Sequence, residues 1–158
     1  MIAQHEPFLI RAIELSHRAR ETGNHPFGAV LVLDDRIVLE AGNTVGVDNS
    51  PLGHAETNLV RMAVREFPRE VLRRSVLYTS CEPCAMCVGA MYWGGIRSVV
   101  YAFPAAELAK LAGGDFLVPC RDLFARASEP VAVVGPLLAD HARTAHEGYW
   151  SPLGSTSA

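Results

Sequence analysis

The chain has 158 residues, of which 49% are hydrophobic, 20% charged and 8% aromatic, and these values are typical of one soluble globular domain. A chain of this length buries roughly 68–70% of the surface that its unfolded form exposes, so its core does not depend on disulfide bonds. Length and composition therefore exclude an intrinsically disordered chain and a small disulfide-stapled scaffold.

Charge and hydropathy narrow the classes of partner. Fourteen Lys and Arg residues against seventeen Asp and Glu residues give a net charge of −3, which argues against a protein that binds nucleic acid by neutralising phosphates. The longest apolar runs, such as residues 27–33, are far shorter than the roughly 18 residues of a membrane-spanning helix. Residues 1–15 lack the pattern of a secretory signal. We expect a cytoplasmic protein that does not enter a membrane and acts on a small uncharged molecule.

Pro, Gly and polar turn residues divide the first half of the chain into elements. Pro7 suits a first helical position, Gly23 stops the apolar helical repeat, and Asp34-Asp35 separates two short apolar runs. In chain order, we predict a helix over 7–20, a hairpin of two buried strands over 27–33 and 37–41, a loop over 43–53, and a helix that begins near His54 and ends at Pro68.

The second half alternates strands and helices. In chain order, we predict a strand over 76–79, a helix from Cys84 to the Gly94-Gly95 break, a strand over 98–101, a helix over 105–111, a helix led by Pro119, a strand over 131–134 and a helix over 136–146. This alternation predicts one sheet with helices on both faces, a three-layer α/β/α architecture. We expect a single domain over residues 1–150 and a frayed tail over 151–158.

The spacing of the cysteines is the first chemical signal. Cys84 and Cys87 are three residues apart, which on a helix places both sulfurs on one face. The N-terminus of a helix favours the thiolate form that binds metals. A Cys-x-x-Cys pair alone also fits a redox dithiol or a structural zinc site. In a reducing compartment, this tight spacing favours metal binding over disulfides.

His54-Ala55-Glu56 strengthens the prediction of a metal site, because it also lies at a predicted helix start after a loop. One imidazole and two thiolates give zinc three protein ligands and leave a fourth tetrahedral position for water. Two thiolates also weaken the ion as a Lewis acid, so a nearby base matters more. Glu56 suits that role, since it can take a proton from water and pass it to a leaving nitrogen. The alternative for Glu56 is a charged residue favoured by the helix dipole.

The combination of His-x-Glu with a later Pro-Cys-x-x-Cys is typical of zinc-dependent nucleobase deaminases. The sequence resembles the cytidine and nucleobase deaminase superfamily, and more closely its guanine deaminase branch. The resemblance covers residues 7 to 115. Its motifs are Pro26-Phe27-Gly28-Ala29-Val30, Asn43, His54-Ala55-Glu56, Tyr78-Thr79-Ser80-Cys81-Glu82-Pro83-Cys84-Ala85-Met86-Cys87 and Gly89-Ala90-Met91-Tyr92-Trp93.

This resemblance implies a cytidine-deaminase-like fold with a central mixed five-stranded sheet, and one zinc ion per subunit held by His54, Cys84 and Cys87. It implies that Glu56 is the proton shuttle and that Asn43 hydrogen-bonds the base through its side-chain amide. It also implies a homodimer or larger oligomer. The alternative for Asn43 is a turn-forming residue at a strand end.

Three further residues are candidate substrate contacts. Phe27 is expected to stack on the base, with an ordinary core aromatic as the alternative, and Trp93 to line the pocket, with simple helix packing as the alternative. Asp115 occupies the place where guanine deaminases carry an acidic residue that contacts the purine. Here, however, the loop reads Gly113-Gly114-Asp115-Phe116 instead of the usual Gly-Phe-Asp-Asp, and Leu52-Gly53 replaces a more usual Thr-Ala. These departures affect the expected guanine specificity and leave the zinc chemistry intact.

The favoured function is hydrolytic deamination of guanine to xanthine and ammonia. Cytosine, guanosine or cytidine are alternative substrates, and a tRNA adenosine deaminase shares the zinc motifs, although the C-terminal region lacks dense Lys and Arg. A structural site that adds Cys81 as a fourth ligand, and a binding protein that merely folds around zinc, are the non-enzymatic alternatives. An iron–sulfur cluster does not match the spacing. The segment around Tyr149 and Trp150 is a further candidate for closing the pocket.

Overall fold

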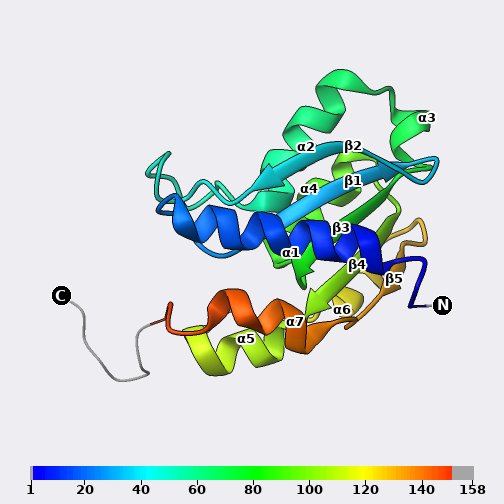
Figure 1. Cartoon of the computed structure of the whole chain (residues 1–158). Coiled ribbons are helices and arrows are strands. Elements are labelled where there is room, and N and C mark those ends of the chain that lie inside the picture. Colours follow the sequence, from blue (N-terminus) through cyan, green and yellow to red (C-terminus); the bar gives the residue numbers. More distant parts are fainter. Residues whose placement is uncertain (1, 151–158) are drawn as a thin grey trace.

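The computed structural model describes residues 2–150, so the tail expected to be frayed lies outside the described residues. Within residues 2–150 the chain forms one five-stranded sheet in the order β2-β1-β3-β4-β5. Strands β1 and β2 and strands β1 and β3 pair antiparallel, whereas β3 with β4 and β4 with β5 pair parallel. The sheet is therefore mixed, as expected (Figure 1).

The elements follow the predicted order with small shifts at their ends. The strands are β1 Gly28–Leu33, β2 Arg36–Gly42, β3 Val76–Cys81, β4 Ser98–Phe103 and β5 Ala132–Val134. The α-helices are α1 Glu6–Glu21, α2 Ala55–Glu66, α3 Arg69–Leu72, α4 Ala85–Gly94, α5 Ala105–Ala112, α6 Cys120–Phe124 and α7 Ala139–Arg143, followed by a 3-10 turn at Thr144–His146. None of these helices is both long and apolar enough to cross a bilayer.

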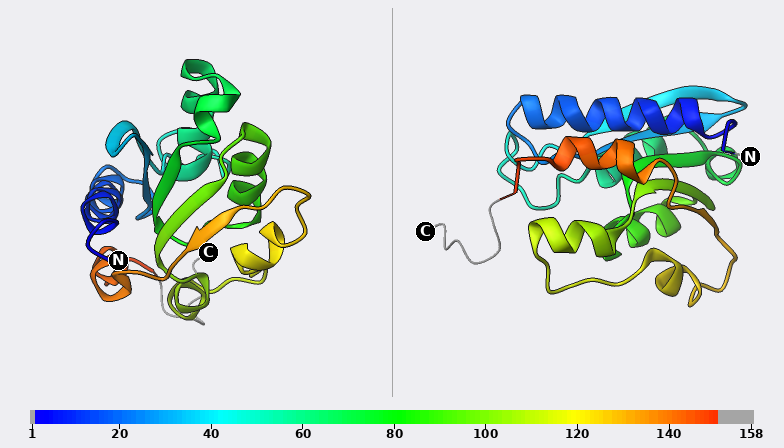
Figure 2. Two further views of the ribbon diagram at one scale, coloured as in Figure 1. Left: turned by 90° about the vertical axis from the view of Figure 1, so that its right-hand side faces the viewer. Right: turned by 60° about the horizontal axis from the view of Figure 1, so that its bottom comes forward.

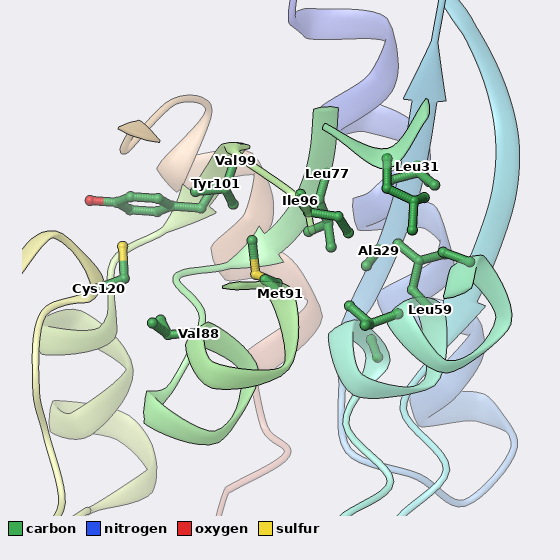
Figure 3. Close-up of a cluster of buried hydrophobic side chains, with 14 of the residues drawn as sticks. Ala29, Leu31, Leu59, Leu77, Val88, Met91, Ile96, Val99, Tyr101 and Cys120 are labelled. Carbon is green, nitrogen blue, oxygen red and sulfur yellow. The ribbon is translucent and has the colours of Figure 1, made fainter. Parts of the chain in front are cut away.

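Alternating strand side chains build two separate hydrophobic cores, because successive residues of a strand point to opposite faces. On β4, Val99 belongs to the core under α2, α4 and α6, and its neighbour Val100 belongs to the core under α1 and α7. Figure 2 (left) shows α1 and α7 on one side of the sheet and α2 and α4 on the other. Figure 3 shows the first core, where Met91 of α4 packs among Leu77 and Ile96. The three-layer α/β/α prediction is confirmed.

Strand direction brings several chain segments together at one edge of the sheet, the edge formed by the carboxyl ends of β3 and β4. The parallel strands β3 and β4 end there, and the antiparallel β1 begins there, just after Phe27. Strand β2 ends at the same edge, just before Asn43, because Gly28 pairs with Gly42. Ligand sites in open α/β sheets lie outside the carboxyl ends of the strands. This edge is therefore where the fold places a site.

Two details of the prediction were wrong. Strand β2 is one of the two edge strands of the sheet, and none of its residues is buried, whereas a buried strand was expected. The last helix was expected over 136–146 but begins only at Ala139. Leu138, the residue before it, has a positive φ of 55°, which is incompatible with a right-handed helix.

Candidate metal centre and active site

Three potential metal ligands from distant parts of the chain converge at this edge. The Nδ1 atom of His54 lies 3.5 Å from the Sγ atoms of both Cys84 and Cys87, and the two sulfurs are 3.5 Å apart. Bonds of roughly 2.0–2.3 Å to a tetrahedral zinc ion place its ligand atoms at about this separation. The donor set and its spacing therefore fit zinc.

Local structure explains why these side chains are free to bind an ion. His54 is the N-cap of α2 and Cys84 is the N-cap of α4, and neither side chain caps its own helix. Cys87 follows in the first turn of α4, on the same face as Cys84. Because the ligands lie at two helix N-termini, the positive ends of α2 and α4 favour negative charge on the sulfurs.

Cys81 is not part of this group. It is 2% exposed and packs in the core under α1, and the described residues that bring three metal-ligating atoms together are His54, Cys84 and Cys87 alone. A three-ligand group leaves one tetrahedral position open for a reacting molecule.

Electrostatics within the group favour an anionic sulfur. The pKa of Cys84 is lowered to about 4, chiefly by its hydrogen bond with Cys87 and also by its hydrogen bond with His54. The bond to Cys84 in turn raises the pKa of His54. A thiolate is the form of cysteine that binds metal, and an ion entering here displaces the proton of the imidazole.

Glu56 lies beside this group, in the first turn of α2, and is 4% exposed. Its Oε1 atom accepts a hydrogen bond of 2.6 Å from the hydroxyl of Thr79, and its Oε2 atom lies 3.4 Å from the sulfur of Cys87. Burial raises the pKa of the Glu56 carboxyl group above its usual value. A carboxyl group in that state can take up a proton and release it again.

Asn43 is buried where the chain leaves β2. Its Oδ1 atom accepts hydrogen bonds from the backbone N–H groups of His25, at 3.2 Å, and Val45, at 3.0 Å. Its Nδ2 group has no hydrogen-bond partner within residues 2–150. The amide therefore has a donor to offer a ligand, and the group it can bind must be an acceptor.

A small cavity of about 80 Å³ opens beside His54, Glu56 and Cys84, and its lining does not include Asn43. Its walls come from the start of β1, the start of α2, the β3 to α4 connection and α5: Phe27, His54, Glu56, Cys81, Glu82, Cys84 and Leu108. A second cavity of about 140 Å³ shares three of these walls and continues beneath residues 113–118. Phe27 thus lies at the metal group as expected.

The structure does not bring Trp93 or Asp115 to this cavity. Trp93 is 78% exposed on α4 and lines a separate groove with Gly89 and Leu123, because its position in the helical turn points away from the sheet. Asp115 is exposed in the loop after α5. Its neighbours Gly114 and Phe116 line the second cavity.

Two residues at the site had no role in the sequence analysis, Thr79 and Glu82. Thr79 is fully buried on β3, where it bonds Glu56. Glu82 borders both cavities and accepts two backbone hydrogen bonds. The signal for Thr79 is a polar residue in an otherwise apolar strand, which requires a partner when buried. Nothing local distinguishes Glu82, because both of its partners are remote in sequence.

Comparison with known proteins agrees with this geometry. Residues 2–103 match the family model described as the cytidine and deoxycytidylate deaminase zinc-binding region. The chain is 40% identical over 149 residues to a probable cytosine deaminase of Schizosaccharomyces pombe, covering 90% of both chains. It is also 40% identical over 115 residues to a guanine deaminase of Bacillus subtilis, covering 72% of this chain and 74% of the relative.

A solved structure from work on A-to-I editing by tRNA:A34 deaminases superposes with a TM-score of 0.73 at 28% identity, covering 89% of this chain and 99% of that one. The family match spans more than half of the chain and includes all three candidate ligands and Glu56. The match, the shared fold and the His-Cys-Cys geometry agree with one another. The chain therefore belongs to the cytidine and deoxycytidylate deaminase family.

Proposed function

We propose that this protein is a zinc-dependent aminohydrolase that converts guanine to xanthine and ammonia. The observation that carries the proposal is the triangle of His54, Cys84 and Cys87 directly beside the buried carboxyl group of Glu56. Three ligands with an open position and an adjacent acid–base group are what hydrolysis at a ring carbon requires.

His54, Cys84 and Cys87 would hold the zinc ion, whose Lewis acidity lowers the pKa of water so that it attacks near neutral pH. Glu56 accepts a proton from the attacking water and returns it to the amino nitrogen of the substrate. The ring carbon gains an oxygen and loses ammonia, so one water molecule is consumed for each ammonia released. The hydroxyl of Thr79 fixes the position of the Glu56 carboxyl group during both transfers.

Asn43 and Phe27 are the proposed contacts with the base. The free amide group of Asn43 donates a hydrogen bond to an acceptor on the ring, such as a carbonyl oxygen. Phe27 provides an aromatic surface for a flat heterocycle. The second cavity, beneath residues 113–118, offers room beyond the ring that is attacked, which favours a two-ring base. Asp115 of that loop is the proposed contact with the purine edge.

Cytosine is the second candidate substrate, because the similarity to the probable cytosine deaminase extends over nearly the whole chain. A tRNA substrate is disfavoured by the net charge of −3, since binding a polyanion requires a basic surface. We propose that the protein acts in the cytoplasm on a free base.

We also propose that the protein is a homodimer. Helix α4 has apolar residues on all sides, and Trp93 on its outer side is 78% exposed beside a groove of about 460 Å³. A helix that is apolar all round is normally covered on every side. Light scattering coupled to size-exclusion chromatography measures the mass directly, and a monomer at micromolar concentration contradicts the proposal.

The deciding experiment measures ammonia release by the zinc-loaded protein from guanine, cytosine, adenine, guanosine and cytidine in parallel. Glu56→Gln serves as the inactive variant, and Glu66→Gln, at the exposed end of the same helix, is the matched control. We expect turnover of guanine that Glu56→Gln abolishes without loss of zinc. Preference for another base overturns guanine as the substrate, and activity in Glu56→Gln overturns the mechanism.

A further inference from the structure

The carboxylate of Glu82 binds both ends of residues 105–120, the segment that covers the second cavity and is called the roof below. The Oε2 atom of Glu82 accepts a hydrogen bond of 2.9 Å from the backbone N–H of Ala105, the first residue of α5. Its Oε1 atom accepts a hydrogen bond of 2.9 Å from the backbone N–H of Cys120, the first residue of α6. Between these two bonds lie α5 and the 113–118 loop.

The sequence makes both helices depend on this contact. The residue before α5 is Pro104 and the residue before α6 is Pro119, and neither provides a side chain that caps its helix. The first N–H groups of a helix have no partner within the helix, so they need an acceptor from elsewhere. Glu82 supplies one oxygen to each helix, and hydrogen bonds to a charged acceptor are stronger than neutral ones.

Glu82 is also fixed to the metal centre. It lies two residues before Cys84, and its own N–H donates a hydrogen bond of 2.8 Å to the carbonyl oxygen of Phe103 at the end of β4. Its side chain borders both the cavity at the metal group and the cavity beneath the 113–118 loop, together with Leu108. The Glu82 side chain therefore connects the roof to the β3–α4 connection that carries Cys84.

We propose that Glu82 is a positioning residue that sets the 113–118 loop over the part of the substrate beyond the attacked ring. This inference rests on the proposed function, and it concerns binding of the base and not the proton transfers. Its consequence is that weakening the Glu82 contacts raises KM for a base that reaches the second cavity. The effect on kcat is small, because Glu56 and the three ligands keep their contacts.

Two variants separate the contact from other roles of the carboxylate. Glu82→Gln keeps the shape but removes the charge and one of the two acceptor oxygens. Ala105→Pro keeps Glu82 but removes the N–H that donates to it. Proline is well suited to a first helical position, and Pro104 already has the extended backbone that precedes a proline (φ −74°, ψ 144°). Glu107→Gln, in the first turn of α5 and bonded to Lys110, is the control for removing a charge.

The test measures steady-state kinetics, zinc content and hydrogen–deuterium exchange of the 113–118 loop in all three variants. For guanine, or whichever base the wild-type protein turns over, we expect KM to rise about tenfold in Glu82→Gln and Ala105→Pro with kcat changed by less than about threefold. The rise is expected to be larger for guanine than for cytosine. Loop exchange becomes faster in both variants, and Glu107→Gln behaves as wild type.

Other outcomes overturn the proposal. Unchanged KM and unchanged hydrogen–deuterium exchange of the loop in Glu82→Gln and Ala105→Pro show that the Glu82 contacts do not position the 113–118 loop. Loss of zinc and of kcat in Glu82→Gln, with Ala105→Pro unaffected, assigns Glu82 to the metal ligands instead. If the wild-type protein deaminates no base, the proposed function fails. Exchange of the 113–118 loop in Glu82→Gln and Ala105→Pro then still decides whether Glu82 holds the roof.

Discussion

The hydroxyl of Thr79 lies 2.6 Å from Oε1 of Glu56, inside the protein and out of contact with solvent. Strand β3 thereby holds the carboxyl group that α2 delivers to the metal centre. The carbonyl oxygen of Cys81, 3.0 Å from the same hydroxyl, is a second acceptor for its single proton. The proposed acid–base group is therefore held by a strand that carries none of the three candidate ligands.

Thr79→Val tests this relationship, because valine has nearly the same shape and lacks the hydroxyl. We expect kcat to fall by about tenfold or more, since a general base must be held within hydrogen-bond reach of its proton. KM and zinc content stay near wild type. Thr79→Ser retains the hydroxyl and is expected to restore most of kcat. Wild-type kcat in Thr79→Val contradicts the positioning role.

Asn43→Asp tests the proposed donor to the base. Aspartate keeps an acceptor for the backbone N–H groups of His25 and Val45 but has no N–H to donate. We expect kcat/KM to fall by about a hundredfold, because a carboxylate facing an acceptor on the base replaces attraction with repulsion. Thermal unfolding stays close to wild type. A kcat/KM within a factor of about three of wild type rules out this contact.

Asn43→Ala provides the structural comparison for the same position. It removes the donor and also the acceptor, so the N–H groups of His25 and Val45 lose their partner. Leaving such groups unsatisfied costs about 1–3 kcal/mol of unfolding free energy. We therefore expect Asn43→Ala to lose both activity and stability, measured by denaturant unfolding, whereas Asn43→Asp loses activity alone.

His146 makes the stability of the fold depend on pH. Burial lowers the pKa of His146 to about 4, and its ring stacks on Phe103 and accepts a hydrogen bond from Trp150. Because the folded pKa lies below the unfolded value, the fold favours the neutral ring. This contribution is complete above about pH 6.5 and is lost as the pH falls toward 4.

We expect the unfolding free energy to fall by up to about 1.4 kcal/mol per pH unit across that range from this group alone. The variant His146→Phe keeps an aromatic ring and cannot be protonated. In this variant, the part of the pH dependence of the unfolding free energy that comes from His146 disappears. His141→Phe changes an exposed histidine in α7 and serves as the control. Equal slopes in wild type and His146→Phe assign the acid sensitivity to other groups.

Gly28 and Gly42 are cross-strand partners that tolerate a methyl group very differently. A Cβ atom at Gly28 meets the backbone carbonyl oxygen of Ala12 at 2.3 Å, so α1 has to move away from β1. At Gly42 the nearest atom is 3.6 Å away, an ordinary contact. We expect Gly28→Ala to lower the unfolding free energy by about 3 kcal/mol and Gly42→Ala to change it by less than about 1 kcal/mol. Similar losses in both variants contradict the close packing of α1.

The element order could be predicted because its signals are local. Pro7, Pro119 and the Gly94-Gly95 pair mark ends of helices through backbone restrictions that act within a few residues. The apolar runs of β1, β3 and β4 mark strands with both faces covered. The exposure of β2 was predicted wrongly, because an apolar run does not reveal whether its strand lies at the centre or the edge of a sheet.

The candidate metal ligands could also be predicted, because Cys84 and Cys87 are neighbours on one helix and His54 begins another. Spacing along a helix fixes which side chains share a face, and that information is wholly in the sequence. The exposed position of Trp93 was not accessible. It depends on which side of α4 the sheet covers, and that side is set by packing with α2 and β4.

The sequence by itself therefore determined the chemistry: a histidine, two cysteines and a glutamate at the starts of two helices. Only the tertiary structure decided how that chemistry is supported. The strand order β2-β1-β3-β4-β5 places Phe27 beside the candidate metal group and Asn43 next to Phe27. It also places Thr79 against Glu56, and Glu82 between two helix starts. These contacts join residues far apart in the chain, and their energies arise only when the sheet closes and buries the polar groups that must then find partners.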